Sequence, residues 1–224
     1  MADHELAGGA QRTSRLLLAG VAAAPVFIGS FLVQGALRPD YDPLRHPVSS
    51  LTLGPGGWVQ QVTFWLTGAL VLACAVGLRR AGYGRAAPIL IGLVGIGLIG
   101  AGVFPADPIS GYPPGSPIPA PRTLPGSLHN LFSTPVFTAL PAAMVVLAIR
   151  FRRQGRAVAA IVSLCCAPVF LTCFVLSSVG FGQNPVLMPY AGLCQRLALI
   201  IGLGWLAGAA ALVRRDVRAG SAMS

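Results

Sequence analysis

Side chains that can do chemistry are scarce in this 224-residue chain, and they gather in three short segments. Residues 38–58, RPDYDPLRHPVSSLTLGPGGW, contain two aspartates, two arginines, a histidine, three hydroxyl residues and a tyrosine. The segments FPADP at 104–108 and TLPGSLHN at 123–130 add another aspartate and another histidine. Carboxylate, imidazole and hydroxyl groups serve acid–base catalysis, nucleophilic catalysis and anion binding. The three segments are therefore the candidate components of one site.

Five residues are the candidate ligand-binding residues. They are His46, Ser50, Asp107, His129 and Arg196. Asp107 follows one apolar run by a few residues and His129 begins the next, so the two side chains are expected at the same membrane depth. Ser50, Asp107 and His129 are also the candidate catalytic residues, because serine, histidine and aspartate together can activate a nucleophile.

Arg196 is the most informative of these residues because it lies within an apolar run. If that run enters the bilayer at Pro185, Arg196 lies about 16 Å deep, and if the boundary is nearer Tyr190 it lies about 9 Å deep. A charge at mid-bilayer costs about 2.5–3.5 kcal/mol on insertion scales, so it is expected to find a partner. We expect an ion pair with Asp107, or an anionic ligand.

Several of the polar residues also have a purely structural interpretation. Ser49 and Ser50 can cap and turn the chain into the next helix. Asp40 and Asp42 stand beside prolines, as turn residues do. A histidine at a helix start is more often a cap than a catalyst. The convergence of three polar segments on one face is what favours a site.

The elements that position these residues follow from composition. The chain is 54% hydrophobic and 10% charged, with a mean hydropathy of +0.73, whereas soluble domains carry about 25% charged residues. Runs of roughly 20 apolar residues span a bilayer core of about 30 Å. Six such runs predict an all-α bundle of six transmembrane helices. The runs cover about 16–37, 58–78, 86–104, 127–149, 157–180 and 185–213.

The predicted domain organisation is simple. Residues 1–14 form a disordered leader, residues 15–215 the transmembrane domain, and residues 216–224 a tail. Eight prolines between Pro105 and Pro125 exclude regular helix and favour an extended loop. Ser127 is the expected N-cap of the fourth helix.

The arginines predict the orientation. Twelve of the sixteen lie at the two ends of the chain and in the second and fourth loops, while the first and third loops hold three. The positive-inside rule then makes both termini cytoplasmic and the loops 38–57 and 105–126 external, in a multi-pass protein of the cell membrane. The net charge of +10 therefore reflects topology and does not indicate nucleic-acid binding.

The five cysteines all fall inside predicted spans and form no CxxC motif, so they are interpreted as small buried hydrophobes. Two small-xxx-small pairs, Gly97 with Ala101 and Gly204 with Gly208, fit either a contact within the bundle or a dimer, and the contact within the bundle is favoured. The homo-oligomeric state stays open.

These segments together resemble a known family. HPVSSLTLGPGGW after the first span, FPADP after the third, TLPGSLH opening the fourth and GLCQR in the sixth are similar to the "domain of unknown function 998" family of bacterial and archaeal membrane proteins. The resemblance covers nearly the whole chain and implies six spans. It also supports the choice of the five candidate residues, but it implies no reaction and leaves open whether the protein is an enzyme.

Three functions fit these residues. In the first, an outward-facing polar pocket in contact with the bilayer binds a lipid headgroup or small anion, without a cofactor. The alternative is an intramembrane hydrolase using Ser, Asp and His, and zinc enters only under this alternative, because zinc enzymes hold the metal with three protein ligands. The third option is a small-solute transporter, for which the chain carries few ionisable residues within its spans.

Overall fold

The computed structural model describes residues 2–117 and 120–222, and within these residues the chain is helical with no strand. Six helices are long and apolar enough to cross a membrane, so the predicted six-span fold is confirmed. They are α1 (Ala2–Leu37), α2 (Gly57–Arg80), α3 (Ala86–Val103), α4 (Leu124–Arg153), α5 (Ala157–Phe181) and α6 (Ala191–Ala222). Two short 3₁₀ helices, η1 (Val48–Thr52) and η2 (Met188–Tyr190), precede α2 and α6.

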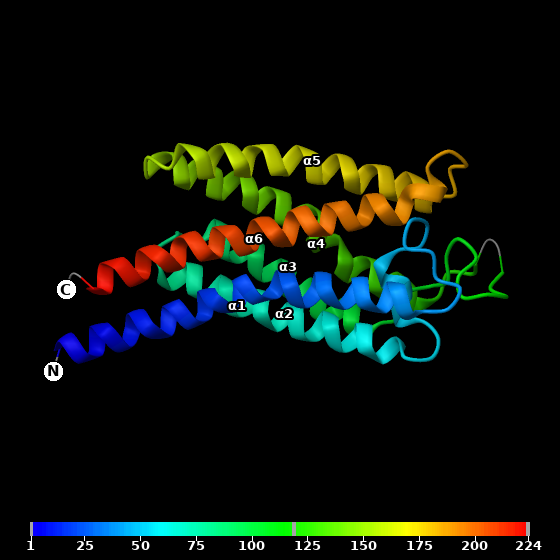
Figure 1. The fold of residues 1–224 in the computed structure, drawn as a ribbon, viewed down its shortest axis with the longest axis horizontal. Coiled ribbons are helices and arrows are strands. Elements are labelled where there is room, and N and C mark those ends of the chain that lie inside the picture. The colour runs from blue at the N-terminus through cyan, green and yellow to red at the C-terminus, as the bar shows by residue number, and fades with distance from the viewer. Residues whose placement is uncertain (1, 118–119, 223–224) are drawn as a thin grey trace.

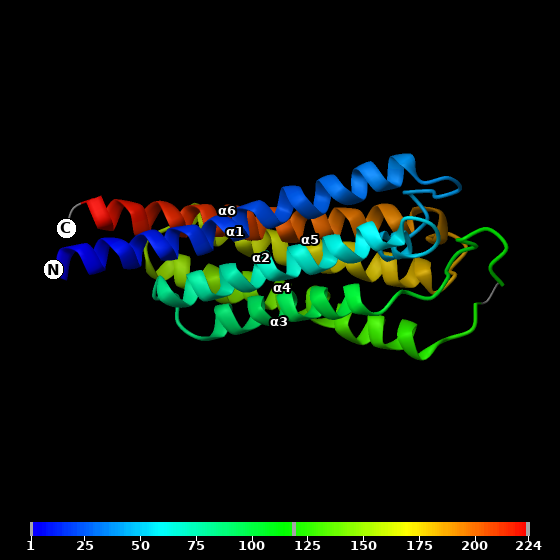
Figure 2. The ribbon, with the colours of Figure 1, turned by 90° about the horizontal axis from the view of Figure 1, so that it is seen from below.

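The six helices form a closed ring. Each packs against its neighbours in the chain, and α6 returns to pack against α1. Both termini and the short turns at 81–85 and 154–156 lie at one end, which we call the terminus end (Figure 1). The loop at 38–56 and the described parts of the loop at 104–123 lie together at the other end, the loop end, also in the perpendicular view of Figure 2. The ring therefore brings the three polar segments to the same end.

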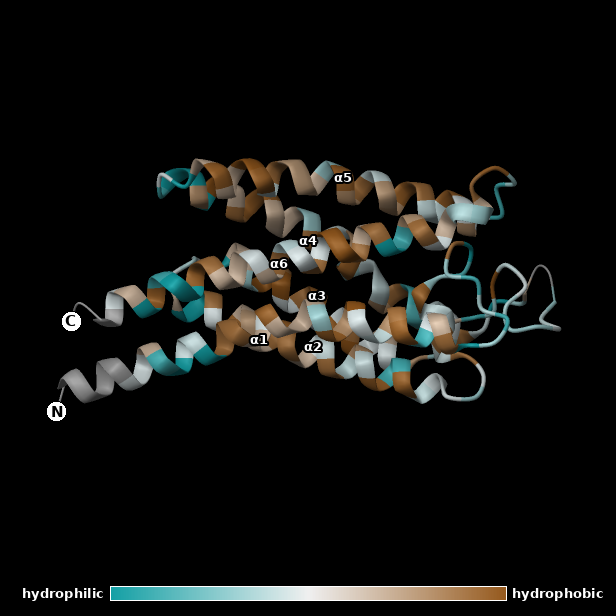
Figure 3. Ribbon diagram, viewed as in Figure 1, coloured by the Kyte–Doolittle hydropathy of each residue, from teal (hydrophilic) through white to brown (hydrophobic). Residues whose placement is uncertain are grey.

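The outer face of the ring is apolar. Hydrophobic residues cover the middle of the bundle, and hydrophilic ones gather toward its two ends (Figure 3). Val158 is 77% exposed and Ile161 60% exposed on α5. Acyl chains solvate such side chains as well as a protein core does. This distribution fits a bundle that stands across a bilayer.

Glycine allows α3 to approach both of its neighbours closely. A Cβ on Gly95 would lie 2.9 Å from the backbone oxygen of Gly68 in α2, and one on Gly97 would lie 2.5 Å from the backbone oxygen of Phe132 in α4. Both distances are too short for real atoms, so α3 depends on glycine at these contacts, as its composition predicts.

The expectation for the two small-residue pairs is half right. Gly97 faces α4, whereas a Cβ on Gly204 or Gly208 would meet nothing within 4 Å. The internal role predicted for the second pair is therefore wrong. The cysteines were all expected to be buried, but their burial differs. Cys74 is fully buried, whereas Cys165 is exposed on α5.

Three helix starts differ from those expected. α1 begins at Ala2, whereas the first span was expected to begin near residue 16. Thr123, and not Ser127, is the N-cap of α4, because its hydroxyl accepts a bond from the Gly126 amide. α6 begins at Ala191, because residues 188–190, which were expected to lie within the helix, form η2.

Candidate functional site

The ring encloses a cavity of about 520 Å³ at the loop end, which we call the chamber. All six helices contribute to its wall, and parts of the loops 38–56 and 104–123 cover it. Its apolar lining includes Phe27, Phe64, Leu98, Phe137, Phe174 and Leu199. The chamber is thus an apolar space closed above by polar loops.

One side of the chamber is polar and comes from α4. Asn130, Thr134 and Thr138 recur every four residues, so they share one face of the helix, and all three line the chamber while being exposed. The hydroxyls of Thr134 and Thr138 donate to carbonyls one turn earlier, each at 2.9 Å, which leaves their lone pairs free to accept. Sequence analysis missed this face, although the spacing could have revealed it.

The chamber opens sideways between α4 and α5. The two helices lie together at the terminus end and diverge toward the loop end (Figures 1 and 2). Exposed lining residues lie on both sides of this gap, Thr134 and Thr138 on α4 and Ser178 on α5. The mouth therefore faces the apolar surroundings of the bundle, beside the loops that cover the chamber.

Asp107 organises the start of α4. Its Oδ1 accepts a 2.6 Å bond from the Thr123 hydroxyl, and its Oδ2 accepts a 3.2 Å bond from the Thr123 amide. A Cβ on Gly126 would collide with this carboxylate, so glycine lets the loop close onto the helix. A carboxylate at a helix N-terminus is also favoured by the helix dipole. Asp107 lines the chamber, with its oxygens held by Thr123.

His129 is held in one orientation at the chamber wall. Its Nδ1 lies 2.9 Å from the Ala101 oxygen and 2.8 Å from the Phe104 oxygen. Because both partners are acceptors, Nδ1 carries the proton, and Nε2 of the neutral ring is an acceptor. The side chain is 2% exposed, lines the chamber and packs edge-on against Phe64.

Arg196 is buried and fully engaged with the first loop. Its Nη1 donates to the backbone oxygens of Pro43 at 2.6 Å, His46 at 2.9 Å and Gly192 at 3.0 Å. Its Nη2 donates to the Tyr41 hydroxyl. Carbonyl dipoles thus take the place of a carboxylate.

The expected Arg196–Asp107 ion pair is therefore wrong, because each of the two residues bonds to other groups. Arg196 lies five residues after the start of α6 at Ala191, which is about 8 Å along the helix axis. Its depth in the bilayer stays a prediction, and this position near the start of α6 is where the loop carbonyls reach the guanidinium.

His46 lies in the loop that Arg196 holds. Its Nδ1 accepts a 2.9 Å bond from the Asp42 amide, and its ring packs between Tyr41 and Tyr112. Burial lowers the pKa of His46, with nearby Arg45 acting in the same direction. His46 does not line the chamber and instead fixes the loop above it.

Ser50 is also outside the chamber lining. It is fully buried in η1, and its hydroxyl has no hydrogen-bond partner among the described residues. Asp107 bonds to Thr123, and Nδ1 of His129 bonds to carbonyls, so the three candidate catalytic residues do not form a hydrogen-bonded triad. Within residues 2–117 and 120–222, no three His, Cys, Asp or Glu side chains are grouped to hold a metal.

The structure thus brings two of the five candidates, Asp107 and His129, to the chamber and leaves the other three outside its lining. A ligand-binding role for any of them stays a prediction. Arg122, which sequence analysis did not select, is the one arginine among the described lining residues.

Comparison with known proteins places the chain in a family. Neither a curated protein nor a solved structure matches it. The family described as "Protein of unknown function (DUF998)" matches residues 21–212, nearly the whole transmembrane bundle, and the chain belongs to this family.

Proposed function

We propose that the chamber binds the polar head of a lipid, with the acyl chain lying in the gap between α4 and α5. The observation that carries this proposal is the row of exposed polar residues Asn130, Thr134 and Thr138 along the mouth of the chamber. Polar side chains within a span normally face protein or an aqueous cavity. A row of polar side chains at a sideways opening therefore supports a ligand whose polar head enters the chamber through that opening.

The size and lining of the chamber support the same ligand. Small-molecule sites commonly enclose about 300–1,000 Å³, and the chamber falls within this range at about 520 Å³. Nε2 of His129 can accept a bond from a hydroxyl of the headgroup, and the Arg122 guanidinium can bind a phosphate at the rim. Phe64 and Phe137 supply apolar contacts deeper in the chamber.

A lipid head is better supported than a free small anion. The buried cation Arg196, which the anion hypothesis relied on, donates to three backbone oxygens and to Tyr41. A free anion would therefore have Arg122 as its arginine partner, in an exposed position. A lipid adds apolar contacts and a route from the bilayer. Hydrolysis and transport stay predictions without a supporting contact.

The test is to fill the chamber from its mouth. Protein carrying Thr138→Phe is extracted from membranes with its bound lipids, which are quantified by mass spectrometry. Val145→Phe is the matched control, because Val145 is 41% exposed on the same helix and does not line the chamber. We expect a specific lipid to co-purify with the unchanged protein and the control, and to be lost from Thr138→Phe. Full retention by Thr138→Phe would refute the proposal.

A further inference from the structure

We propose a second site, at the terminus end of the ring, that binds the phosphate of an anionic phospholipid. A hollow of about 220 Å³ lies there between the turn that joins α2 to α3 and the last turns of α4. Its lining includes Arg85 from the turn and Arg150 and Arg153 from α4. We call it the arginine hollow. It lies at the opposite end from the chamber and does not depend on the function proposed there.

The positive charge of the arginine hollow is not neutralised by the protein. No Asp or Glu lines it, and the ion pair that the described residues form joins Arg156 to Asp216. Arg85 and Arg153 are exposed and have no hydrogen-bonding side-chain partner among the described residues. Three guanidinium groups around one hollow create a strong preference for an anion, and their planar donors match the oxygens of a phosphate.

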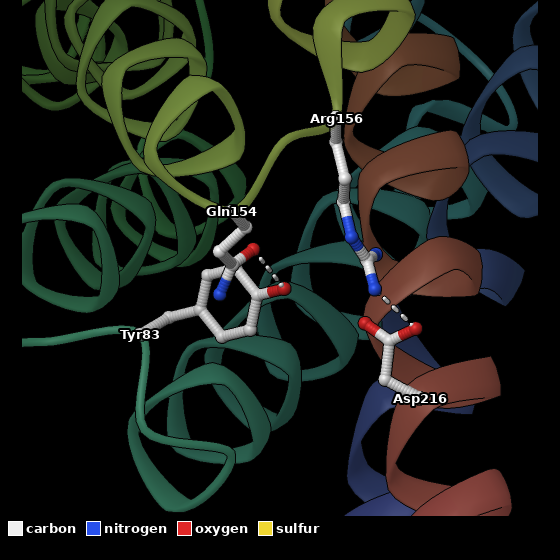
Figure 4. Close-up of polar contacts among 4 residues, drawn as sticks. All are labelled: Tyr83, Gln154, Arg156 and Asp216. Atoms are coloured by element: carbon white, nitrogen blue, oxygen red, sulfur yellow. Dashed lines mark hydrogen bonds and ion pairs between the residues drawn. The ribbon is translucent and has the colours of Figure 1, made fainter.

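The walls of the hollow are held in place before any ligand binds. Nη2 of Arg150 donates to the Gly82 oxygen at 3.0 Å, and its guanidinium lies over the Tyr83 ring at 5.8 Å. The Tyr83 hydroxyl in turn donates to Oε1 of Gln154 at 3.1 Å. Figure 4 shows this bond beside the Arg156–Asp216 ion pair, which ties the neighbouring turn to α6. Such preorganisation lowers the cost of binding.

The start of α3 adds to the attraction. Arg85 is the N-cap residue, and its side chain makes no cap hydrogen bond to the helix. The first amide groups of a helix lack partners within the helix and carry partial positive charge. Ala86, the first residue of α3, lines the hollow, so this charge lies next to the three arginines.

The neighbouring apolar residues point to a lipid as the source of the phosphate. Val146 and Ile149 also line the hollow, and Ile149 is 49% exposed on the outer face of α4. An acyl chain can run along this face while its headgroup contacts the arginines. Basic pockets between helices at the membrane surface bind anionic lipid headgroups in this way.

The experiment measures lipid binding by the full chain in detergent with native mass spectrometry. Phosphatidylglycerol and phosphatidylcholine with the same acyl chains are titrated against the unchanged protein, Arg85→Gln and Arg153→Gln. Arg152→Gln is the matched control, since Arg152 is exposed in the same last turn of α4 but does not line the hollow. We expect tighter binding of phosphatidylglycerol, a loss of about fivefold for each hollow arginine removed, and no loss for Arg152→Gln.

Three results would overturn the proposal. These are equal binding of the two lipids, an equal loss for Arg152→Gln, and displacement of phosphatidylglycerol by an equal concentration of inorganic phosphate. The last would identify a free anion as the ligand. Because Arg85 and Arg153 have no side-chain partners among the described residues, their variants are expected to unfold at the temperature of the unchanged protein, which a thermal melt verifies.

Discussion

Arg196 shows how a single charged residue can serve a membrane protein without a counter-charge. The residue is 6% exposed, and its guanidinium lies among backbone oxygens and near the rings of Phe31 and Tyr41, at 5.7 and 5.4 Å from their centroids. Arginine suits this place because its planar group carries five donors in a fixed geometry. It joins the loop at 38–56 to α6, together with Gln195, whose Oε1 accepts a 2.8 Å bond from the Val48 amide. The residue is thus a structural anchor of the chamber's roof.

Replacing this anchor is predicted to destabilise the loop end. Arg196→Leu leaves the Pro43 oxygen without its side-chain donor and leaves the His46 oxygen with the longer 3.3 Å bond from the Tyr41 hydroxyl. A buried acceptor left unpaired costs about 1–3 kcal/mol. We expect a clearly lower unfolding temperature in a thermal melt of the purified protein. Arg122→Leu is the control, because Arg122 is exposed and is expected to leave stability unchanged. Equal melting of Arg196→Leu and the unchanged protein would contradict the anchoring role.

At the scale of elements, α3 and α4 form the chamber in different ways. α3 presents glycine to its neighbours, so the three helices α2, α3 and α4 form a tightly packed side of the ring. α4 instead carries prolines at 135 and 141 and a polar face, and it leans away from α5 at the loop end (Figure 1). Tight packing on one side and divergence on the other leave the space that becomes the chamber.

The glycine contacts give a matched pair of substitutions. Gly97→Ala puts a Cβ 2.5 Å from the Phe132 oxygen, whereas Gly204→Ala meets nothing within 4 Å. Overpacking costs about 1–3 kcal/mol, and alanine in an open helix position is otherwise favoured over glycine. We expect Gly97→Ala to lower the unfolding temperature and Gly204→Ala to keep or raise it. Equal effects of the two substitutions would argue against the α3–α4 packing described above.

At the scale of the whole molecule, the ring explains why the polar residues occur where they do. Six spans return both termini to one end and place the two long loops at the other (Figures 1 and 2). The two ends then differ in chemistry. The loop end carries the chamber, with hydroxyl and amide groups, and the terminus end carries the arginine hollow. The two proposals together give one bundle two separate sites for polar headgroups, one at each end of the ring.

Sequence patterns predicted the spans well because span length and apolarity are set by the bilayer itself. They placed helix starts less well, since the start of α4 depends on which hydroxyl, Thr123 or Ser127, meets a free amide. The partner of Arg196 could not be predicted, because backbone oxygens are present at every residue and only the folded loop selects three of them. Asp107 and His129 were found because each lies next to a span end.

The orientation in the membrane is the remaining property of the whole molecule that the arginine distribution predicts. Leu44, which is 48% exposed in the loop at 38–56, is expected outside the cell, and Arg152 at the terminus end is expected inside. A membrane-impermeant maleimide added to intact cells should label Leu44→Cys but label Arg152→Cys only after permeabilisation. The unchanged chain, whose five cysteines lie within the helices, gives the background. The opposite labelling pattern would invert the topology and place the arginine hollow in the outer leaflet.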